Sequence, residues 1–362
     1  MSWYFFEPIF YLKPKILYFH TVSISFVRND ILLLSKHFEV KTFSFRPSKK
    51  ILTPFVFIKQ FFYLLFNLRG TSIVISQFAG YHSFLPNLFA VITKKISLII
   101  LGGTECVSFP SINYGNFNRH LLGLFTKWSL ILAKHLSPVH ESLVLSDYTY
   151  TDDDFQKQGY NYFCPNIKTP HTIIRYGYDP TQFFKTKDSN NTNSFITVGQ
   201  MNAPNFYRKG ADLIFEMAKR FPTCTFTIVG NTSKMKYTSV PPNVTLIPFV
   251  PYEELKDYYS AHKFYFQLSI CEGFPSAICE AMLCECIPIG SDVAAIPEII
   301  GDTGYLLKKR DENELEKLII QALSSKKENL GLKARERIIE RYPPEEREKL
   351  VNLINKLISD NN

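Results

Sequence analysis

Residues 264–282 limit the fold more strongly than any other segment, because they predict a buried strand, a tight turn and a helix in immediate succession. Residues 264–269 (FYFQLS) are apolar and aromatic enough for a buried strand, and Pro275 stands where a helix can begin. Such a turn leaves the first backbone N–H groups of the helix unpaired and directs the positive end of its dipole at a ligand. The end of this strand is therefore a natural seat for a phosphate group.

Two glutamates, Glu272 and Glu280, frame this turn with seven residues between them. Eight positions are a little over two helical turns, so the second carboxylate returns to roughly the same side as the first, and one ligand could contact both. A solvated helix face is the alternative. The continuation favours the ligand, because residues 287–291 (IPIGS) predict a second short strand, residues 296–300 (IPEII) another helix and residues 301–307 a turn and strand.

This block resembles the donor half of the retaining group 1 (family 4) glycosyltransferases, in which two glutamates with this spacing follow a turn of the E-G-F-P type and precede a P-E-hydrophobic segment. The likeness covers about residues 174–307, including residues 195–199 (FITVG), 208–212 (RKGAD) and 224–230 (CTFTIVG). It implies an α/β GT-B fold, with two Rossmann-like domains, an active site in the cleft between them and a C-terminal helix that crosses back to the first domain.

Length and pattern agree with two domains, because 362 residues exceed what one core usually supports. We expect an acceptor-side domain over residues 1–180, a nucleotide-sugar-binding domain over residues 181–344 and the returning helix over residues 345–362. The polar residues 185–193 are the best linker candidate. Apolar segments of the first domain predict strands at residues 15–20, 40–45, 72–76, 96–101, 135–139 and 142–145.

The resemblance assigns a cation to the donor diphosphate. Lys209, followed by Gly210 at a helix start, matches the family's phosphate-binding lysine, and Arg208 is placed to assist it. A fixed cation is most valuable at the diphosphate, because breaking the bond to the anomeric carbon loads negative charge onto that leaving group. An exposed Arg-Lys pair without a ligand is the alternative.

The resemblance also assigns the donor-binding carboxylates. Glu280 matches the glutamate that accepts hydrogen bonds from the ribose hydroxyls, and Glu272 matches the one that faces the donor sugar. Gly273 and Phe274 would offer backbone N–H groups at close approach, and Pro275 completes this turn. Because the implied reaction is retaining, with the departing phosphate taking the acceptor proton, neither glutamate is expected to act as a general base.

The chain departs from the family pattern at two places. Gln200 stands where many members carry a phosphate-binding arginine, and the first-domain His-Gly pair is absent, since residues 101–105 read LGGTE. Glu105 and His82 are the candidates for the acceptor side, with a purely structural histidine as the alternative for His82.

No metal and no cofactor beyond the nucleotide-sugar substrate are expected. The acidic run at residues 152–154 resembles a metal-binding D-x-D motif but predicts the N-terminus of a helix at residues 155–159. Seven cysteines at irregular spacing indicate a reducing compartment, and Cys279, Cys284 and Cys286 are expected to pack. Neither a G-x-x-x-x-G-K-S/T loop nor a G-x-G-x-x-G motif is present.

The positive charge belongs to the first part of the chain. Residues 1–100 hold 12 Lys and Arg against 3 Asp and Glu, a net +9, whereas the whole chain is +8. Residues 55–66 (FVFIKQFFYLLF) are strongly apolar but shorter than the roughly 20 residues of a membrane span. Two interpretations stay open, a buried core helix or a peripheral contact of residues 1–100 with an anionic membrane surface. Nucleic-acid binding is not expected, because no docking element accompanies the basic residues.

The sequence thus predicts a metal-independent, retaining glycosyltransferase of the hexosyltransferase type that moves a sugar from a nucleotide sugar to a glycan or lipid-linked acceptor in surface polysaccharide or glycolipid biosynthesis. The start of the chain lacks the order of a signal peptide, which predicts a cytoplasmic protein, with the inner face of the membrane as its place of action. The main alternative is a non-catalytic partner subunit that binds nucleotide sugar or glycan, as Gln200 and the missing histidine suggest. A nucleotide-sugar epimerase or hydrolase on the same scaffold is the third.

Overall fold

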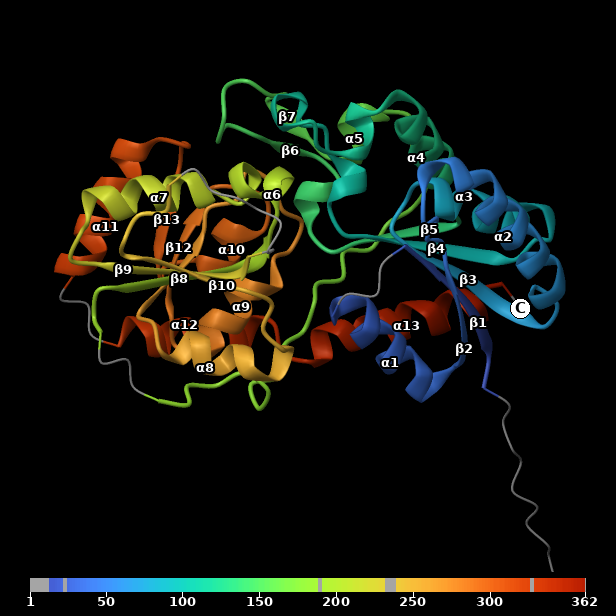
Figure 1. Ribbon diagram of the computed structural model, residues 1–362. Coiled ribbons are helices and arrows are strands. Elements are labelled where there is room, and N and C mark those ends of the chain that lie inside the picture. The colour runs from blue at the N-terminus through green and yellow to red at the C-terminus, as the bar shows by residue number, and fades with distance from the viewer. Residues whose placement is uncertain (1–12, 22–24, 188–190, 232–238, 326–328, 362) are drawn as a thin grey trace, which may run out of the picture.

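A computed structural model describes residues 13–21, 25–187, 191–231, 239–325 and 329–361 (Figure 1). Its helices and strands alternate along the chain and form two separate parallel sheets, which confirms the α/β class. The linker candidate at residues 185–193 lies partly outside the described residues. The domain limits at residues 180 and 344 stay predictions.

The first sheet has five parallel strands in the order β2-β1-β3-β4-β5. Its strands are β1 (Lys15–His20), β2 (Glu39–Ser44), β3 (Thr71–Gln77), β4 (Ile96–Leu101) and β5 (His135–Pro138), and its helices are α1 (Ser25–His37), α2 (Thr53–Asn67), α3 (Tyr81–Ile92) and α4 (His120–Leu132). Short elements join them: η1 (Lys50–Leu52), η2 (Thr104–Cys106), η3 (Pro110–Ile112), η4 (Asn116–Asn118), η5 (Glu141–Leu143), the antiparallel pair β6 (Ser146–Asp147) and β7 (Lys157–Gln158), and α5 (Tyr160–Phe163).

Two expectations for this half are wrong. The segment at residues 142–145 is no strand, because the His140 side chain accepts a hydrogen bond from the Ser142 N–H at 3.2 Å and starts the 3-10 turn η5. The acidic run at residues 152–154 starts no helix. Instead, the Asp154 carboxylate accepts hydrogen bonds from the Ser111 hydroxyl at 2.6 Å and the Thr151 hydroxyl at 3.1 Å, which hold a bend before β7.

The second sheet has six parallel strands in the order β10-β9-β8-β11-β12-β13. Its strands are β8 (Ser194–Met201), β9 (Thr225–Asn231), β10 (Val244–Ile247), β11 (Phe264–Gln267), β12 (Ile287–Ser291) and β13 (Tyr305–Leu307). The remaining elements are α6 (Ala203–Arg208), α7 (Ala211–Arg220), η6 (Tyr252–Glu254), α8 (Leu255–Ser260), α9 (Ser276–Leu283), α10 (Ile296–Ile300), α11 (Glu312–Ser324), α12 (Leu330–Arg341) and α13 (Glu345–Ser359).

Stacked phenylalanines fill the core of the second sheet. The ring of Phe195 on β8 stacks on those of Phe226, Phe264 and Phe266, with centroids 4.9–5.1 Å apart. All four side chains are buried, and aromatic residues of this size dominate the stability of a core. They fix β8, β9 and β11 next to one another and thus the loops that follow these strands.

Both sheets contain a point where the strand order reverses. In the first sheet it lies between β1 and β3, and in the second between β8 and β11. In open α/β sheets, ligands bind outside the carboxyl ends of the strands at such a point. Each sheet therefore offers one ligand site, and the two must face each other for a shared cleft to form.

The C-terminal helix α13 returns to the first sheet, where Figure 1 shows it in red beside the blue α1. Arg347 on α13 donates to both carboxylate oxygens of Asp30 on α1, one bond measuring 2.7 Å, and also to the carbonyl of Ile174 at 3.0 Å. The two charged side chains are only 8% and 1% exposed. This buried ion pair ties the end of the chain to its first domain.

Helix α2 is not the buried core helix that one interpretation of residues 55–66 proposed. Within α2, only Gln60 and Leu64 are buried. Its other apolar side chains are half-buried or exposed, and Phe66 is 80% exposed. No helix in the described part of the chain is long and apolar enough to cross a membrane.

Candidate functional site

A cavity of about 860 Å³ lies between the two sheets and receives the loops at both reversal points. The first domain supplies Thr21 after β1, Phe78, Ala79 and Gly80 after β3, and residues 102–105 after β4; the second supplies residues 198–200 from β8, Arg208 and Lys209, and residues 271–277 after β11. The carboxyl ends of both sheets thus face one space, which is large enough for a nucleotide-sized ligand.

Glu272 and Lys209 form an ion pair in this cavity, with Lys209 Nζ 3.1 Å from Glu272 Oε1. The same oxygen accepts hydrogen bonds from the Ser269 hydroxyl at 2.8 Å and from Gln267 Nε2 at 3.3 Å. Among the described residues no hydrogen-bond partner is found for Oε2. Burial alone would raise the pKa of Glu272, but the charges of Lys209 and Arg208 outweigh it and lower that pKa. Glu272 is therefore an ionised acceptor.

Two glycines position Lys209: Gly210 follows it in the chain, and Gly199 on β8 lies under its side chain. Lys209 follows the end of α6, and Gly210 then adopts a left-handed conformation with φ of +74° before α7 begins. A Cβ on Gly199 would lie 3.2 Å from Lys209 Cδ and Cε, so a larger residue in β8 would press on the lysine side chain. The backbone thus presents the ammonium group at the end of β8.

Arg208 lies across the junction of the two domains. Its guanidinium donates to Asn205 Oδ1 at 3.0 and 3.2 Å and to the carbonyl of Cys271 at 3.5 Å, and it stands 4.7 Å from the ring centre of Tyr114 in the first domain. Gln200 lines the same cavity and is exposed. The positive charge next to β8 therefore comes from Arg208 and Lys209.

Position 273 must be a glycine, because the backbone of the first domain packs directly against it. A Cβ at this position would lie only 1.8 Å from the carbonyl oxygen of Gly102, so the two domains touch backbone to backbone here. Phe274 belongs to the cavity lining but is buried, and its ring packs against Tyr178 and Tyr342 with centroids 6.4 and 5.1 Å away. Pro275 follows as the residue that precedes α9.

The structure does not place Glu280 in the cavity with Glu272. Glu280 is 5% exposed, is absent from the cavity lining and accepts a hydrogen bond from the Tyr259 hydroxyl at 3.2 Å. Burial raises its pKa to about 7, although hydrogen bonds from Tyr259 and Tyr252 oppose the shift. The periodicity argument does not apply to this pair, because α9 begins at Ser276 and Glu272 is not part of the helix.

The two first-domain candidates both line the cavity. His82, on α3, is 4% exposed; its Nε2 lies 2.9 Å from the carbonyl of Gln77, and burial lowers its pKa to about 4, which leaves it neutral. Glu105 is 2% exposed and accepts a hydrogen bond from the Gly102 N–H at 2.5 Å, and burial raises its pKa to about 7.

Sequence reasoning missed several residues of this site. Gln267 and Ser269 orient Glu272, and Tyr114 contacts both Arg208 and Thr104, whose hydroxyl lies 2.6 Å from the tyrosine hydroxyl. The first two could have been found, because polar residues at the carboxyl end of a buried strand belong to the ligand edge of a parallel sheet. Nothing in the sequence pattern marked Tyr114.

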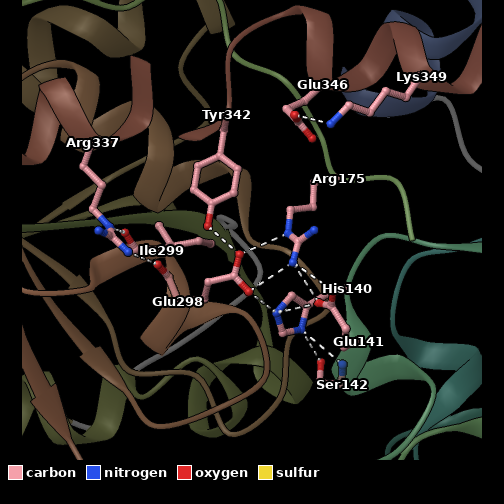
Figure 2. A network of polar contacts seen from close by, with 10 residues as sticks. All are labelled: His140, Glu141, Ser142, Arg175, Glu298, Ile299, Arg337, Tyr342, Glu346 and Lys349. Atoms are coloured by element: carbon pink, nitrogen blue, oxygen red, sulfur yellow. Dashed lines mark hydrogen bonds and ion pairs between the residues drawn. The ribbon is translucent and has the colours of Figure 1, made fainter. Parts of the chain in front are cut away.

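One group of possible metal ligands is found among the described residues, namely His140, Glu141 and Glu298. Figure 2 shows the guanidinium of Arg175 within the same network: Arg175 lies 2.9 Å from Glu141 and 3.1 Å from Glu298, and His140 Nε2 lies 3.0 Å from Glu298. Arg175 pairs with both carboxylates, and the network links the first domain to Glu298 of the second.

Residues 179–343 match the family model described as glycosyl transferases group 1. The chain is 23% identical over 175 residues, 42% of its length, to a phosphatidylinositol N-acetylglucosaminyltransferase subunit of Arabidopsis thaliana, and 32% identical over 80 residues, 22% of its length, to O-antigen chain mannosyltransferase B of Escherichia coli. The matched stretches cover 39% and 21% of these relatives.

Solved structures match nearly the whole chain. Sucrose-phosphate synthase from Thermosynechococcus elongatus aligns over 96% of this chain and 100% of its own, with a TM-score of 0.75 and 16% identity. Anabaena HepE in complex with UDP and glucose aligns over 95% of this chain and 100% of its own, with a TM-score of 0.67 and 12% identity. These matches confirm the expected GT-B fold.

Proposed function

We propose that this chain, whose residues 179–343 match the group 1 glycosyl transferase family model, moves a sugar from a nucleotide sugar to a glycan or lipid-linked acceptor, with retention and without a metal ion. The observation that carries the proposal is the Lys209–Glu272 pair, 3.1 Å apart, in a cavity where the ligand edges of two parallel sheets meet. A cation and an ionised carboxylate side by side suit a ligand with an anionic part next to hydroxyl groups.

In this proposal the donor pyrophosphate binds against Lys209, with Arg208 next to it and the backbone N–H groups of the turn at Gly273 and Phe274 as further donors. Negative charge grows on the leaving phosphate as the bond to the anomeric carbon breaks, so donors fixed there stabilise the transition state more than the ground state. Binding of the diphosphate would also separate Lys209 from Glu272 in part, which frees the carboxylate to accept sugar hydroxyls.

The two glutamates have different proposed partners. Glu272 accepts from the donor sugar, which its ionised state and its Oε2 atom support. Glu280 accepts from the ribose, as the family resemblance implies, although its carboxylate is held by Tyr259 in the present structure. Because HepE was solved with UDP, uridine diphosphate is the first nucleotide to test for this chain.

The acceptor is assigned to the first-domain side of the cavity, next to Glu105 and His82. We propose that neither serves as the main base, since the departing phosphate takes the acceptor proton in the retaining reaction that the resemblance implies. We further propose a cytoplasmic location at the inner face of a membrane, with contact through residues 1–100, of which the structure describes residues 13–21 and 25–100.

The test is turnover of a panel of UDP- and GDP-sugars with lipid-linked and free sugar acceptors, in the wild type and in Lys209→Ala and Glu272→Gln. We expect transfer that survives a chelator, a product whose anomeric configuration matches the donor by NMR, and a large loss in both variants. Equal activity in all three proteins would overturn the site.

A second candidate function is a non-catalytic subunit that binds nucleotide sugar or glycan, favoured by Gln200 in place of the family arginine. Calorimetry distinguishes the two, because a subunit of this kind would bind UDP without turnover on any acceptor of the panel. Sugar release without an acceptor would instead indicate the epimerase or hydrolase alternative.

A further inference from the structure

Helix α2 presents a stripe of large apolar side chains to solvent. Phe55, Ile58, Phe62, Leu65 and Phe66 are 67, 54, 50, 52 and 80% exposed. Their positions recur at intervals of three, four and one residues, which places them on one face of the helix. A helix that is apolar on all sides is normally covered, so this face indicates a partner that the folded chain itself does not supply in its described part.

The stripe continues over the two neighbouring helices. The rings of Phe61 and Phe89 join α2 to α3 at 5.3 Å, and those of Phe84 and Trp128 join α3 to α4 at 5.7 Å. Further exposed apolar side chains on α3 and α4 are Val91, Ile92, Leu121, Trp128 and Ile131, between 41 and 68% exposed. Together with the five α2 residues they form what we call the docking face, and Figure 1 shows the three helices that carry it, α2, α3 and α4, beside the first sheet.

The segment that carries the docking face is strongly basic. Residues 40–140 contain eleven Lys and Arg but only one acidic residue, Glu105, whose side chain is buried in the cavity wall. Lys59 and Arg69 are exposed on and just beyond α2, and Lys94 and Lys127 are exposed on the neighbouring elements. The helices that carry the docking face therefore combine apolar side chains with cations, and residues 40–140 contribute no exposed carboxylate to it.

We propose that the docking face binds an anionic lipid bilayer and thereby holds the cavity next to an acceptor whose lipid anchor stays in that bilayer. Binding to the bilayer is inferred from the docking face alone. The claim that this binding serves a lipid-anchored acceptor also rests on the proposed function. Phenylalanine, leucine and tryptophan on an amphipathic surface enter the boundary of headgroups and acyl chains, and lysine and arginine add attraction to anionic lipids. A second copy of the chain fits less well, since an isologous interface would bring these cations face to face.

The cavity lining reaches the N-terminal end of α2. Its lining includes Phe45, Arg46 and Pro47, which precede the helix, and Thr53, the first residue of α2. Deeper along the helix, Gln60 donates to the carbonyl of His82, another cavity residue, at 2.7 Å. The stripe thus begins next to a lining residue of the cavity and runs about 20 Å along α2. A lipid-linked acceptor could therefore reach the cavity while its anchor stays at the membrane surface.

Flotation of the full chain with vesicles tests the docking face independently of catalysis. The vesicles are phosphatidylcholine alone, or phosphatidylcholine with about one third phosphatidylglycerol to give an anionic surface. The first variant is Phe62→Ser with Phe66→Ser, and the second is Lys59→Glu with Arg69→Glu. The matched control is Ile320→Ser with Ile339→Ser, because these side chains are 52 and 37% exposed in the second domain.

We expect the wild type and the control to float with anionic vesicles and to bind neutral vesicles much more weakly. The phenylalanine variant should bind at least about tenfold more weakly. The charge variant should also bind anionic vesicles at least about tenfold more weakly, because each cation lost near the surface is worth roughly fivefold. Equal flotation of the wild type and both variants, or no flotation of the wild type, would overturn the proposal. So would a wild-type dimer that the phenylalanine variant converts to a monomer.

Measurements of sugar transfer distinguish failure of this inference from failure of the proposed function. Both variants should transfer sugar to a free acceptor at the wild-type rate and lose rate only with the lipid-linked acceptor in anionic vesicles. If the wild type floats with vesicles but transfers sugar to no acceptor, the docking face stands and the proposed glycosyltransferase function is refuted. If the variants lose the same rate with the free and the lipid-linked acceptor, the link between the docking face and the lipid-linked acceptor is refuted.

Discussion

Replacing Lys209 with alanine tests the proposed mechanism most directly. Its Nζ lies 3.1 Å from Glu272 Oε1 in the cavity, and its side chain packs on Gly199. Loss of one preorganised donor to developing negative charge lowers a rate by about 10²–10³, or about 2.7–4 kcal/mol of transition-state stabilisation. We expect the kcat of Lys209→Ala to fall by this amount with a smaller change in KM, because the charge on the leaving phosphate grows in the transition state.

The structure also predicts how the losses of rate in neighbouring substitutions compare. The guanidinium of Arg208 is held by Asn205 and the Cys271 carbonyl and lies over the ring of Tyr114. It cannot take the place of Lys209 without losing these contacts, so Arg208 should not rescue Lys209→Ala. Arg208→Ala should in turn cost less rate than Lys209→Ala, and Lys209→Arg should recover part of the loss.

The same substitution should shift the pH profile. Burial raises the pKa of Glu272, and Lys209 and Arg208 more than reverse this. Without Lys209 the effect of burial is less opposed, so the pKa of Glu272 rises in the variant. Activity that needs the ionised carboxylate falls as pH drops through this pKa, and in Lys209→Ala the fall should therefore begin at a higher pH.

Initial rates of nucleotide-sugar consumption from acidic to neutral pH measure both effects. Glu272→Gln is the control, because it removes the titrating group and should abolish the part of the acid limb that belongs to Glu272. A Lys209→Ala protein with a rate within about twofold of the wild type and an unshifted acid limb would refute the reasoning.

Three further predictions concern how the domains are held. Gly273→Ala should lower activity by about 10²-fold and enlarge the radius of gyration in solution scattering, because its Cβ would lie 1.8 Å from a backbone oxygen of the first domain; an unchanged radius would contradict this. Asp30→Ala should lower the free energy of unfolding in denaturant by about 3–5 kcal/mol, since it leaves the buried guanidinium of Arg347 unpaired. Burial lowers the pKa of His140 despite Glu298, so the folded state binds fewer protons than the unfolded state, and Tm should decline as pH falls below 6.5, less steeply in His140→Gln.

Local patterns in the sequence predicted the donor block well. The apolar segment from residue 264 and Pro275 predicted a strand and a helix start, and the structure has β11 at Phe264–Gln267 and α9 from Ser276. Both predictions depend on periodicity and on the fixed φ of proline, which act over a few residues. The parallel arrangement of the strands followed from their alternation with helices.

The parts that failed depend on contacts between distant residues. The expectation that Glu280 shares a face with Glu272 failed, because Glu280 lies next to Tyr259 on α8, which no spacing on α9 reveals; its role toward the ribose stays a prediction. Asp154 accepts a hydrogen bond from Ser111, 43 positions away in the sequence, and this contact stabilises a bend where a helix was expected. Residues 55–66 permit two interpretations, a core helix or a helix at a membrane surface, because an apolar helix does not encode whether another element covers it. Tertiary packing decided each case.

The position of Glu298 connects these observations to the site. Sequence resemblance placed it in the donor half, yet its carboxylate accepts from the Tyr342 hydroxyl at 3.0 Å and pairs with His140 and Arg175 (Figure 2). Tyr342 in turn packs on Phe274, the residue next to the Gly273 contact between the domains. The turn that carries the proposed donor-binding groups is therefore supported by the interface, so the geometry of the cavity depends on how closely the two domains approach each other.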